Sequence, residues 1–171
     1  MKVEVSVEGF ADLDRALGDL SRAAGRRALR KALRAAAEPI ASEMRSKTRG
    51  GLRESITVSN KLAPRQARIS RRIGASTAAV ELFVGPSYEL GSGGRAAHLI
   101  EFGTQQRVQE TTGRATGRIK AAPFARPAWD NNKSKSLGII RTQLWQEIKA
   151  ATARAEAKAL RAARKAARNA G

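Results

Sequence analysis

His98 and Glu101 are the two side chains whose types and spacing come nearest to an acid–base pair. They are three residues apart and would share one face of a helical turn, and the chain has no other histidine. An imidazole beside a carboxylate can transfer protons in catalysis or can fix a turn by hydrogen bonding. We favour the structural role, because no further group of a catalytic constellation accompanies the pair.

The sequence lacks residues that a metal site, a hydrolytic site or a nucleotide site would each require. A zinc site needs about three or four Cys, His or carboxylate ligands, whereas the chain has one histidine and no cysteine. A Gly-x-Ser-x-Gly elbow to accompany His98 is absent, since Ser92 lies in a glycine-rich run. That run, residues 91–94, also lacks the lysine and helix start of a phosphate-binding loop. We therefore expect no enzyme activity, no metal and no cofactor.

Two segments concentrate the rare residue types of this sequence, whose aromatic content is only 4%. Residues 98–104 and 122–129 together hold the histidine, one of two tryptophans, two of four phenylalanines and two of five prolines. Pro123 and Pro127 fix φ and extend the residue before each, and Pro127 suits the first position of a helix. Phe124 and Trp129 are candidates for either core packing or a partner contact, with the core favoured for Phe124.

The net charge of +18, from 33 basic and 15 acidic residues, indicates a negative partner, either nucleic acid or an acidic protein surface. Because few aromatic residues could stack on bases, a nucleic-acid contact would go to phosphates and would depend on salt. A solvated helix face is the commoner meaning of such charge runs. The candidate contact residues are Arg107, Arg114, Arg118, Lys120, Arg154, Lys158, Arg161, Arg164, Lys165 and Arg168.

Hydrophobic periodicity predicts three helices, at residues 10–20, at 22–48 and from Pro127 onward. The second has an apolar stripe, and Pro39 within it should bend or split the helix. The third thins to alanine beyond Ala150 and then carries six basic residues against one acid, a net charge of +5. This end would project into solvent, pack on a neighbouring subunit or meet a negative surface. The predicted stripe of the second helix comprises Leu29, Leu33, Ala36, Ile40 and Met44.

Alternating apolar residues predict strands at residues 3–7, 55–59, 67–73 and 79–84. We expect an α+β fold, with one antiparallel sheet of about four strands packed against the long N-terminal helix. Gly50-Gly51 would form the turn into this β region. The segments 88–94 and 105–120 would be loops. This organisation predicts a core domain of residues 1–130 and a basic C-terminal helix extension of residues 131–171.

Three motifs in order resemble a known family. They are Thr48-Arg49-Gly50-Gly51-Leu52-Arg53-Glu54-Ser55-Ile56, which follows a basic helix, then His98-Leu99-Ile100-Glu101-Phe102-Gly103-Thr104, and Ala122-Pro123-Phe124-Ala125-Arg126-Pro127-Ala128. They resemble the gene-product-ten-like phage tail components, the neck or tail-completion proteins of long-tailed phages. The resemblance covers roughly residues 3 to 150. One departure is that Arg49 and an extra glycine interrupt the family's Thr-Gly-Leu-Arg-x-Ser-Ile.

The resemblance implies a virion structural protein of the neck or tail, made in the host cytoplasm and without catalysis. It would form a homo-oligomeric ring, a hexamer or dodecamer, through heterologous contacts. Its partners would be the head-completion or connector protein, the tail terminator or tail tube protein, and genomic DNA passing through the ring. The expected subunit or partner contacts are His98, Glu101, Phe102, Thr104, Phe124, Arg126, Pro127 and Trp129.

Two further expectations concern location and the alternative function. No run of about eighteen apolar residues occurs, so we expect no transmembrane helix and no membrane partner. The N-terminus lacks the apolar centre of a signal peptide. The alternative to a virion protein is a non-specific nucleic-acid-binding protein that uses its basic helices.

Overall fold

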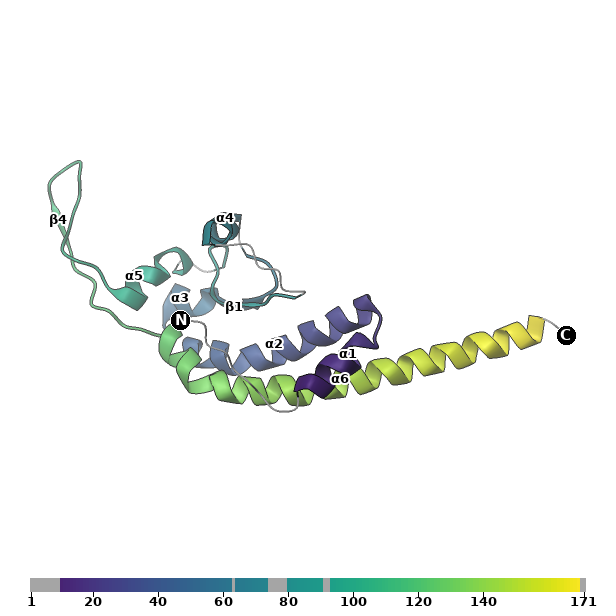
Figure 1. Ribbon diagram of the computed structural model, residues 1–171. Helices are drawn as coiled ribbons and strands as arrows, with labels where there is room; N and C mark the ends of the chain where they lie inside the picture. The colour runs from purple at the N-terminus through teal and green to yellow at the C-terminus, as the bar shows by residue number, and fades with distance from the viewer. Residues whose placement is uncertain (1–9, 63, 74–79, 91–92, 170–171) are drawn as a thin grey trace. The chain divides into compact units, whose positions relative to one another are not determined.

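The computed structural model describes residues 10–62, 64–73, 80–90 and 93–169, and the chain, drawn in Figure 1, divides into two compact units. Unit 1 is drawn from residues 1–35 and 137–171, and unit 2 is residues 36–136. Two long helices, α2 (Arg22–Ser46) and α6 (Ala125–Asn169), each contribute to both units. The division into a core domain of residues 1–130 and an extension stays a prediction.

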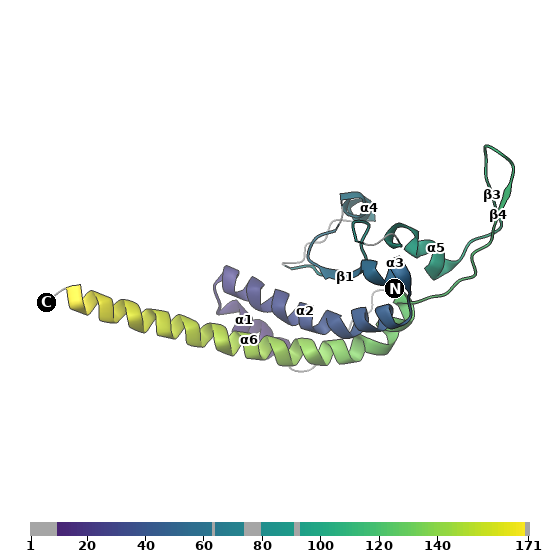
Figure 2. The ribbon, with the colours of Figure 1, turned by 180° about the vertical axis from the view of Figure 1, so that it is seen from behind.

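Unit 1 is helical. Helix α1 (Phe10–Gly18) packs with the first part of α2 and the later part of α6, and the three lie side by side in both ribbon views (Figures 1 and 2). In the part of α2 that belongs to unit 1, Gly25, Ala28 and Ala32 are buried, whereas the predicted stripe residues Leu29 and Leu33 are only half-buried. Small side chains let helices approach closely. The core of unit 1 comprises Leu13, Ala28, Ala32, Leu144 and Ile148.

Unit 2 combines short helices with small sheets. Its elements besides α2 and α6 are α3 (Gly50–Ser55), β1 (Ile56–Ser59), α4 (Pro64–Ile73), β2 (Phe83–Pro86), η1 (Gly94–Ala96), α5 (Ala97–Phe102), β3 (Arg107–Val108) and β4 (Ala115–Gly117). Helix α2 is continuous across Pro39 and is not split. The buried residues Ile40, Ala41 and Met44 follow Pro39 directly, so packing holds this turn in place. The core of unit 2 comprises Ile40, Ala41, Met44, Leu52, Ile56, Ala97, Phe124 and Ala128.

The predicted sheet of about four strands is not confirmed, because the described residues form two separate sheets of two strands each. Strand β1 confirms the strand predicted at 55–59, and it pairs antiparallel with β2 so that Ile56 faces Pro86 and Ser59 faces Phe83. Strand β2 begins four residues later than the strand predicted at 79–84. The strand predicted at 3–7 lies outside the described residues.

The segment predicted as a strand at 67–73 is part of helix α4. The predicted alternation counted Arg71 as an inward residue beside Ile69 and Ile73. Those two isoleucines are four residues apart, which suits one face of a helix equally well. Pro64 is the first residue of α4, a position that proline favours. The spacing of this short segment fits both a strand and a helix, and the proline at its start favours the helix.

The Gly50-Gly51 pair does not form the predicted turn, since it opens helix α3. Gly93 and Gly94, at the end of the segment predicted as a loop, approach neighbouring backbone closely. A Cβ on Gly93 would lie 2.4 Å from the Leu52 nitrogen, and one on Gly94 would lie 2.0 Å from the Ser87 carbonyl oxygen. Only glycine allows this approach, so the tight contact explains why small residues occur there.

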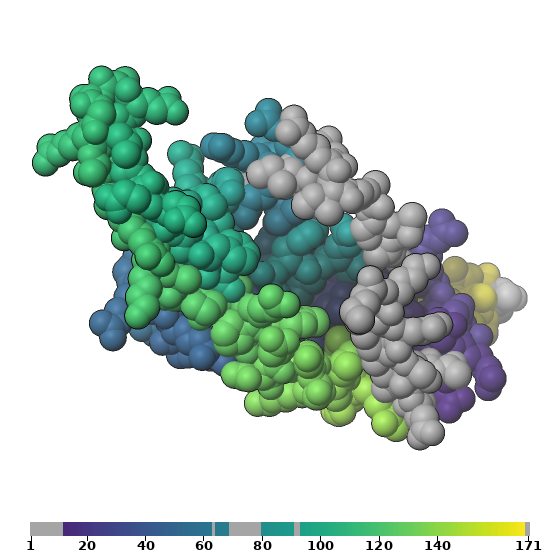
Figure 3. All heavy atoms as spheres, turned by 60° about the vertical axis from the view of Figure 1, so that its left-hand side comes forward, coloured from purple at the N-terminus to yellow at the C-terminus, as the bar shows by residue number. Residues whose placement is uncertain are grey.

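The polar segment 105–120, predicted to be a long loop, contains the antiparallel hairpin of β3 and β4. The two strands are short and exposed. In the space-filling view the hairpin projects from the rest of unit 2 (Figure 3). We call residues 105–118 the arm.

Candidate functional site

The two segments that concentrate the rare residues lie together in unit 2. The Ala122 amide donates to the Ile100 carbonyl at 2.8 Å, and the Thr104 amide donates to the Ile119 carbonyl at 2.9 Å. The Thr104 hydroxyl in turn accepts from the Ile119 amide at 3.0 Å. These bonds close the base of the arm, so residues 100–104 and 119–122 form one junction.

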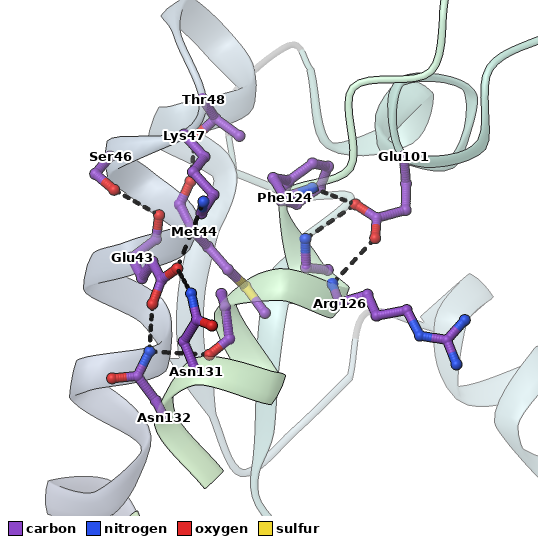
Figure 4. A network of polar contacts seen from close by, with 12 residues as sticks. Glu43, Met44, Ser46, Lys47, Thr48, Glu101, Phe124, Arg126, Asn131 and Asn132 are labelled. Atoms are coloured by element: carbon purple, nitrogen blue, oxygen red, sulfur yellow. Dashed lines mark hydrogen bonds and ion pairs between the residues drawn. The ribbon is translucent and has the colours of Figure 1, made fainter. Parts of the chain in front are cut away.

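The Glu101 carboxylate caps the start of helix α6 (Figure 4). Its Oε2 atom accepts from the amides of Phe124 at 2.7 Å and Ala125 at 2.9 Å, and its Oε1 atom accepts from the Arg126 amide at 3.1 Å. The first four N–H groups of a helix have no partner within it. Three of them are satisfied here by one side chain from the other segment.

Pro127 completes this cap. Helix α6 begins at Ala125, so Pro127 is its third residue. The prediction that Pro127 is the first residue of the helix is wrong. The fourth of the N–H groups that lack a partner would be that of residue 127. Proline has no N–H, so no donor is left unpaired there. Every backbone donor of the first turn is therefore either bonded to Glu101 or absent, which explains why an acid and a proline occur in these two segments.

The cap lowers the pKa of Glu101. Burial raises this pKa, but the hydrogen bonds from Ala125, Phe124 and Arg126 and the positive charge of Arg126 outweigh it. The carboxylate is thus charged at neutral pH, and it faces the positive end of the α6 dipole. Because Glu101 lies in the last turn of α5 and its partners begin α6, one charged group joins the two helices.

Gly103 lets the chain turn away from α5 directly after the capping residues. Its φ of 73° and ψ of −178° lie in a region that is essentially restricted to glycine. A Cβ there would also lie 2.9 Å from the Ala121 nitrogen and 3.0 Å from the Ile119 carbonyl oxygen. Helix α5 accordingly ends at Phe102, and Gly103 is its C-cap residue.

A second polar cluster joins the end of α2 to the first turns of α6 within unit 2. Glu43 accepts hydrogen bonds from the side-chain amides of Asn131, at 2.7 Å, and Asn132, and pairs with Lys47 at 3.5 Å (Figure 4). The pKa of Glu43 is lowered, chiefly by the Asn131 bond, whereas burial raises it and the Asn132 bond and the Lys47 charge lower it further. The buried Ser136 hydroxyl donates to the Ala36 carbonyl at 2.7 Å.

His98 takes no part in these bonds. It is exposed, and among the described residues no hydrogen bond joins it to Glu101. The predicted pairing of His98 with Glu101 is therefore wrong, because the carboxylate is engaged by three backbone amides. Thr104, by contrast, belongs to the junction through its amide and its hydroxyl.

The aromatic side chains divide between core and surface. Phe124 is 2% exposed and packs in the core of unit 2, as favoured from the sequence. Phe102 and Trp129 are 79% and 54% exposed. Phe102 lines a groove of about 250 Å³ at the base of the arm, together with Thr104 and Arg118. Arg126 is exposed and Pro127 half-buried.

The ten candidate basic residues are all exposed. None of them forms an ion pair within the part of the chain that the structure describes. Arg107, Arg114 and Arg118 belong to the arm, Lys120 follows it, and the other six lie on α6. The two groups belong to different units.

Glu101 and Glu43, whose pKa values are the ones shifted among the described carboxylates, are both bonded to neighbouring groups of the fold. Over the described ranges, no group of three or more His, Cys, Asp or Glu residues could hold a metal ion. No helix among those residues is long and apolar enough to span a membrane.

Sequence reasoning missed both polar clusters. For the cap, a signal was present: Glu101 is the only acid in either segment, and the first turn of α6 needs an acceptor. For Glu43 the sequence carries no such signal, because its partners are 88 and 89 residues away.

Comparison with known proteins agrees with a tail component. A family model described as "Bacteriophage HK97-gp10, putative tail-component" matches residues 11–103, more than half of the 171 residues. The match includes the Thr48–Ile56 motif and residues 98–103, and it is narrower than the extent of roughly 3 to 150 indicated by the motifs. Neither the comparison with curated proteins nor that with solved structures gave a match. This chain belongs to the HK97-gp10-like family of bacteriophage tail components.

Proposed function

We propose that this protein forms a ring in the phage neck, between the head connector and the tail terminator or tube, and completes the tail. Membership in a family of tail components supports a structural role in the virion. It gives no support to the alternative of a free nucleic-acid-binding protein. The ring and its position are the proposal.

The exposed pair Phe102 and Trp129 carries the proposal of a subunit interface. Large aromatic side chains are enriched at protein interfaces, where they supply most of the binding energy. Phe102 ends α5 and Trp129 lies in the second turn of α6, so they stand on the two helices that the Glu101 cap joins. Contact residues on rigid elements lose little entropy on binding.

In this proposal the heterologous contact of the ring includes the groove at the base of the arm and the two exposed aromatics. The arm extends the contact to the next subunit or to a neighbouring ring. Phe124, included among the contact residues predicted from the sequence, acts indirectly here, because it fixes the start of α6 from within the core.

Alanine substitution of the exposed pair tests this interface. Phe102→Ala with Trp129→Ala should leave folding intact, since surface substitutions usually change stability by less than about 0.5 kcal/mol. It should abolish oligomers in light scattering and yield particles without joined tails. Leu90→Ala with Leu160→Ala is the matched control, because these residues are 48% and 55% exposed and lie elsewhere.

Normal infectious particles from the aromatic double variant would remove the pair from the interface. The position is tested separately, by electron microscopy of virions that carry a C-terminal tag. Density in a ring at the head–tail junction supports the neck assignment. Density along the tail or at its tip would contradict the neck while leaving a tail component.

A further inference from the structure

Five cations form a straight stripe on the last part of α6. Arg154, Lys158, Arg161, Lys165 and Arg168 follow one another at steps of four, three, four and three residues. At ~100° per residue they fall within an arc of about 80°, and at 1.5 Å per residue they extend over about 21 Å. All five are exposed. We call them the basic stripe.

The charges of the basic stripe are not neutralised by any described acidic residue. None of its five residues forms an ion pair among the described residues. The one acid after Ala150, Glu156, lies about 160° from the centre of the stripe. Like charges three and four residues apart destabilise a helix. An external polyanion would offset this repulsion.

A groove beside α2 adds a sixth cation. Arg154 and Lys158 line a hollow of about 330 Å³ in unit 1, together with Arg27 from α2. Glu147, the acid of this groove, is already paired with Lys31. The positive surface therefore continues from the stripe onto the start of α2.

The composition of this surface favours nucleic acid over an acidic protein. Stable protein interfaces need a buried apolar or aromatic anchor and are depleted in lysine. Alanines and one further cation, Arg164, border the stripe, and Leu160 lies about 120° away from its centre. Phosphate contacts need only charge, and duplex DNA offers one charge per about 1.7 Å of its axis.

We infer that the basic stripe binds the phosphate backbone of duplex DNA without sequence preference. The inference deepens the proposed function by naming DNA as a partner. It rests on that function only for the place in the virion where the protein and the DNA would meet. The binding itself is a property of the isolated chain. Its failure would therefore leave the tail function untouched.

Binding of the full chain to a duplex of about 20 base pairs, measured by fluorescence anisotropy over a range of salt, tests the stripe. Each phosphate contact contributes about 0.9 to the slope of log Kd against log salt, so five contribute about 4 to 5. Because the chain carries +18 overall, the decisive variant keeps all charges. It combines three exchanges with neighbouring alanines: Arg154→Ala with Ala153→Arg, Arg161→Ala with Ala163→Arg, and Lys165→Ala with Ala166→Lys.

This scattered variant has the same composition and net charge, but its cations are spread around the helix. The slope should fall by about 2, because two or three cations no longer reach the duplex. A second variant, with all five stripe residues changed to Gln, should lose the full contribution of about 4 to 5. Circular dichroism verifies that both variants keep their helix.

Three results would overturn the inference. The first is an unchanged slope in the scattered variant beside a reduced slope in the Gln variant, which would show that net charge alone acts. The second is absence of DNA binding by the unaltered chain. The third is equal binding of polyglutamate with the same dependence on the stripe, which would assign the surface to acidic proteins.

Discussion

Replacing Glu101 by alanine should loosen the start of α6, because three backbone amides lose their acceptor at once. The Phe124 residue is buried, and a buried amide without a partner costs about 1 to 2 kcal/mol. Loss of the negative charge at the helix N-terminus adds about 0.5 kcal/mol. The amides of Ala125 and Arg126 lie nearer to solvent, where water replaces the carboxylate. The expected loss is therefore about 2 kcal/mol.

Amide hydrogen exchange measures this loss locally. A loss of about 2 kcal/mol corresponds to roughly 30-fold faster exchange at residues 124–126 if local opening limits exchange. Glu110→Ala is the matched control, since Glu110 is an exposed glutamate of the arm. Glu101→Gln should lose about 1 kcal/mol, because one oxygen still accepts while the amide nitrogen opposes an N–H donor.

The pH dependence has a defined sign. Since the pKa of Glu101 is lowered from its ordinary value of 4.5, the native state binds this proton less readily than the unfolded state. The advantage of the unaltered chain over Glu101→Gln should be complete above pH 4.5 and should vanish as the pH falls through the lowered pKa. Equal exchange rates in Glu101→Ala and Glu110→Ala, or a pH-independent difference between the unaltered chain and Glu101→Gln, would refute the cap.

Two further predictions concern the supports of the junction. Gly103→Ala should lower the free energy of unfolding by about 1 to 3 kcal/mol, because of its φ and the approach of Ala121. Gly138→Ala, within α6 and with nothing within 4 Å of its Cβ, should raise it by about 0.5 to 1 kcal/mol. Urea unfolding measures both, and the reverse order would contradict the geometry. Asn131→Ala should raise the pKa of Glu43 toward its ordinary value, and an unchanged NMR titration would contradict the assigned cause.

Local patterns in the sequence determined the helices well. The 3.6-residue period located α1, α2 and α6, because an amphipathic stripe is a property of neighbouring residues. The prediction of a strand at 67–73 was wrong. Seven residues fit both the strand period and the helix period when a charged residue is counted as inward. The burial of Ala28 and Ala32 was also missed, because hydrophobicity alone does not show which faces of two helices pack together.

The concentration of rare residues in two segments and the order of the motifs along the chain are properties of the sequence by itself, and they indicated the tail-component family. The tertiary structure alone decided what Glu101 does. Its spacing from His98 suggested a local pair, but its actual partners lie 23 to 25 residues further on. The unpaired N–H groups at the start of a helix stabilise a carboxylate. Only the folded chain brings the first turn of α6 to Glu101.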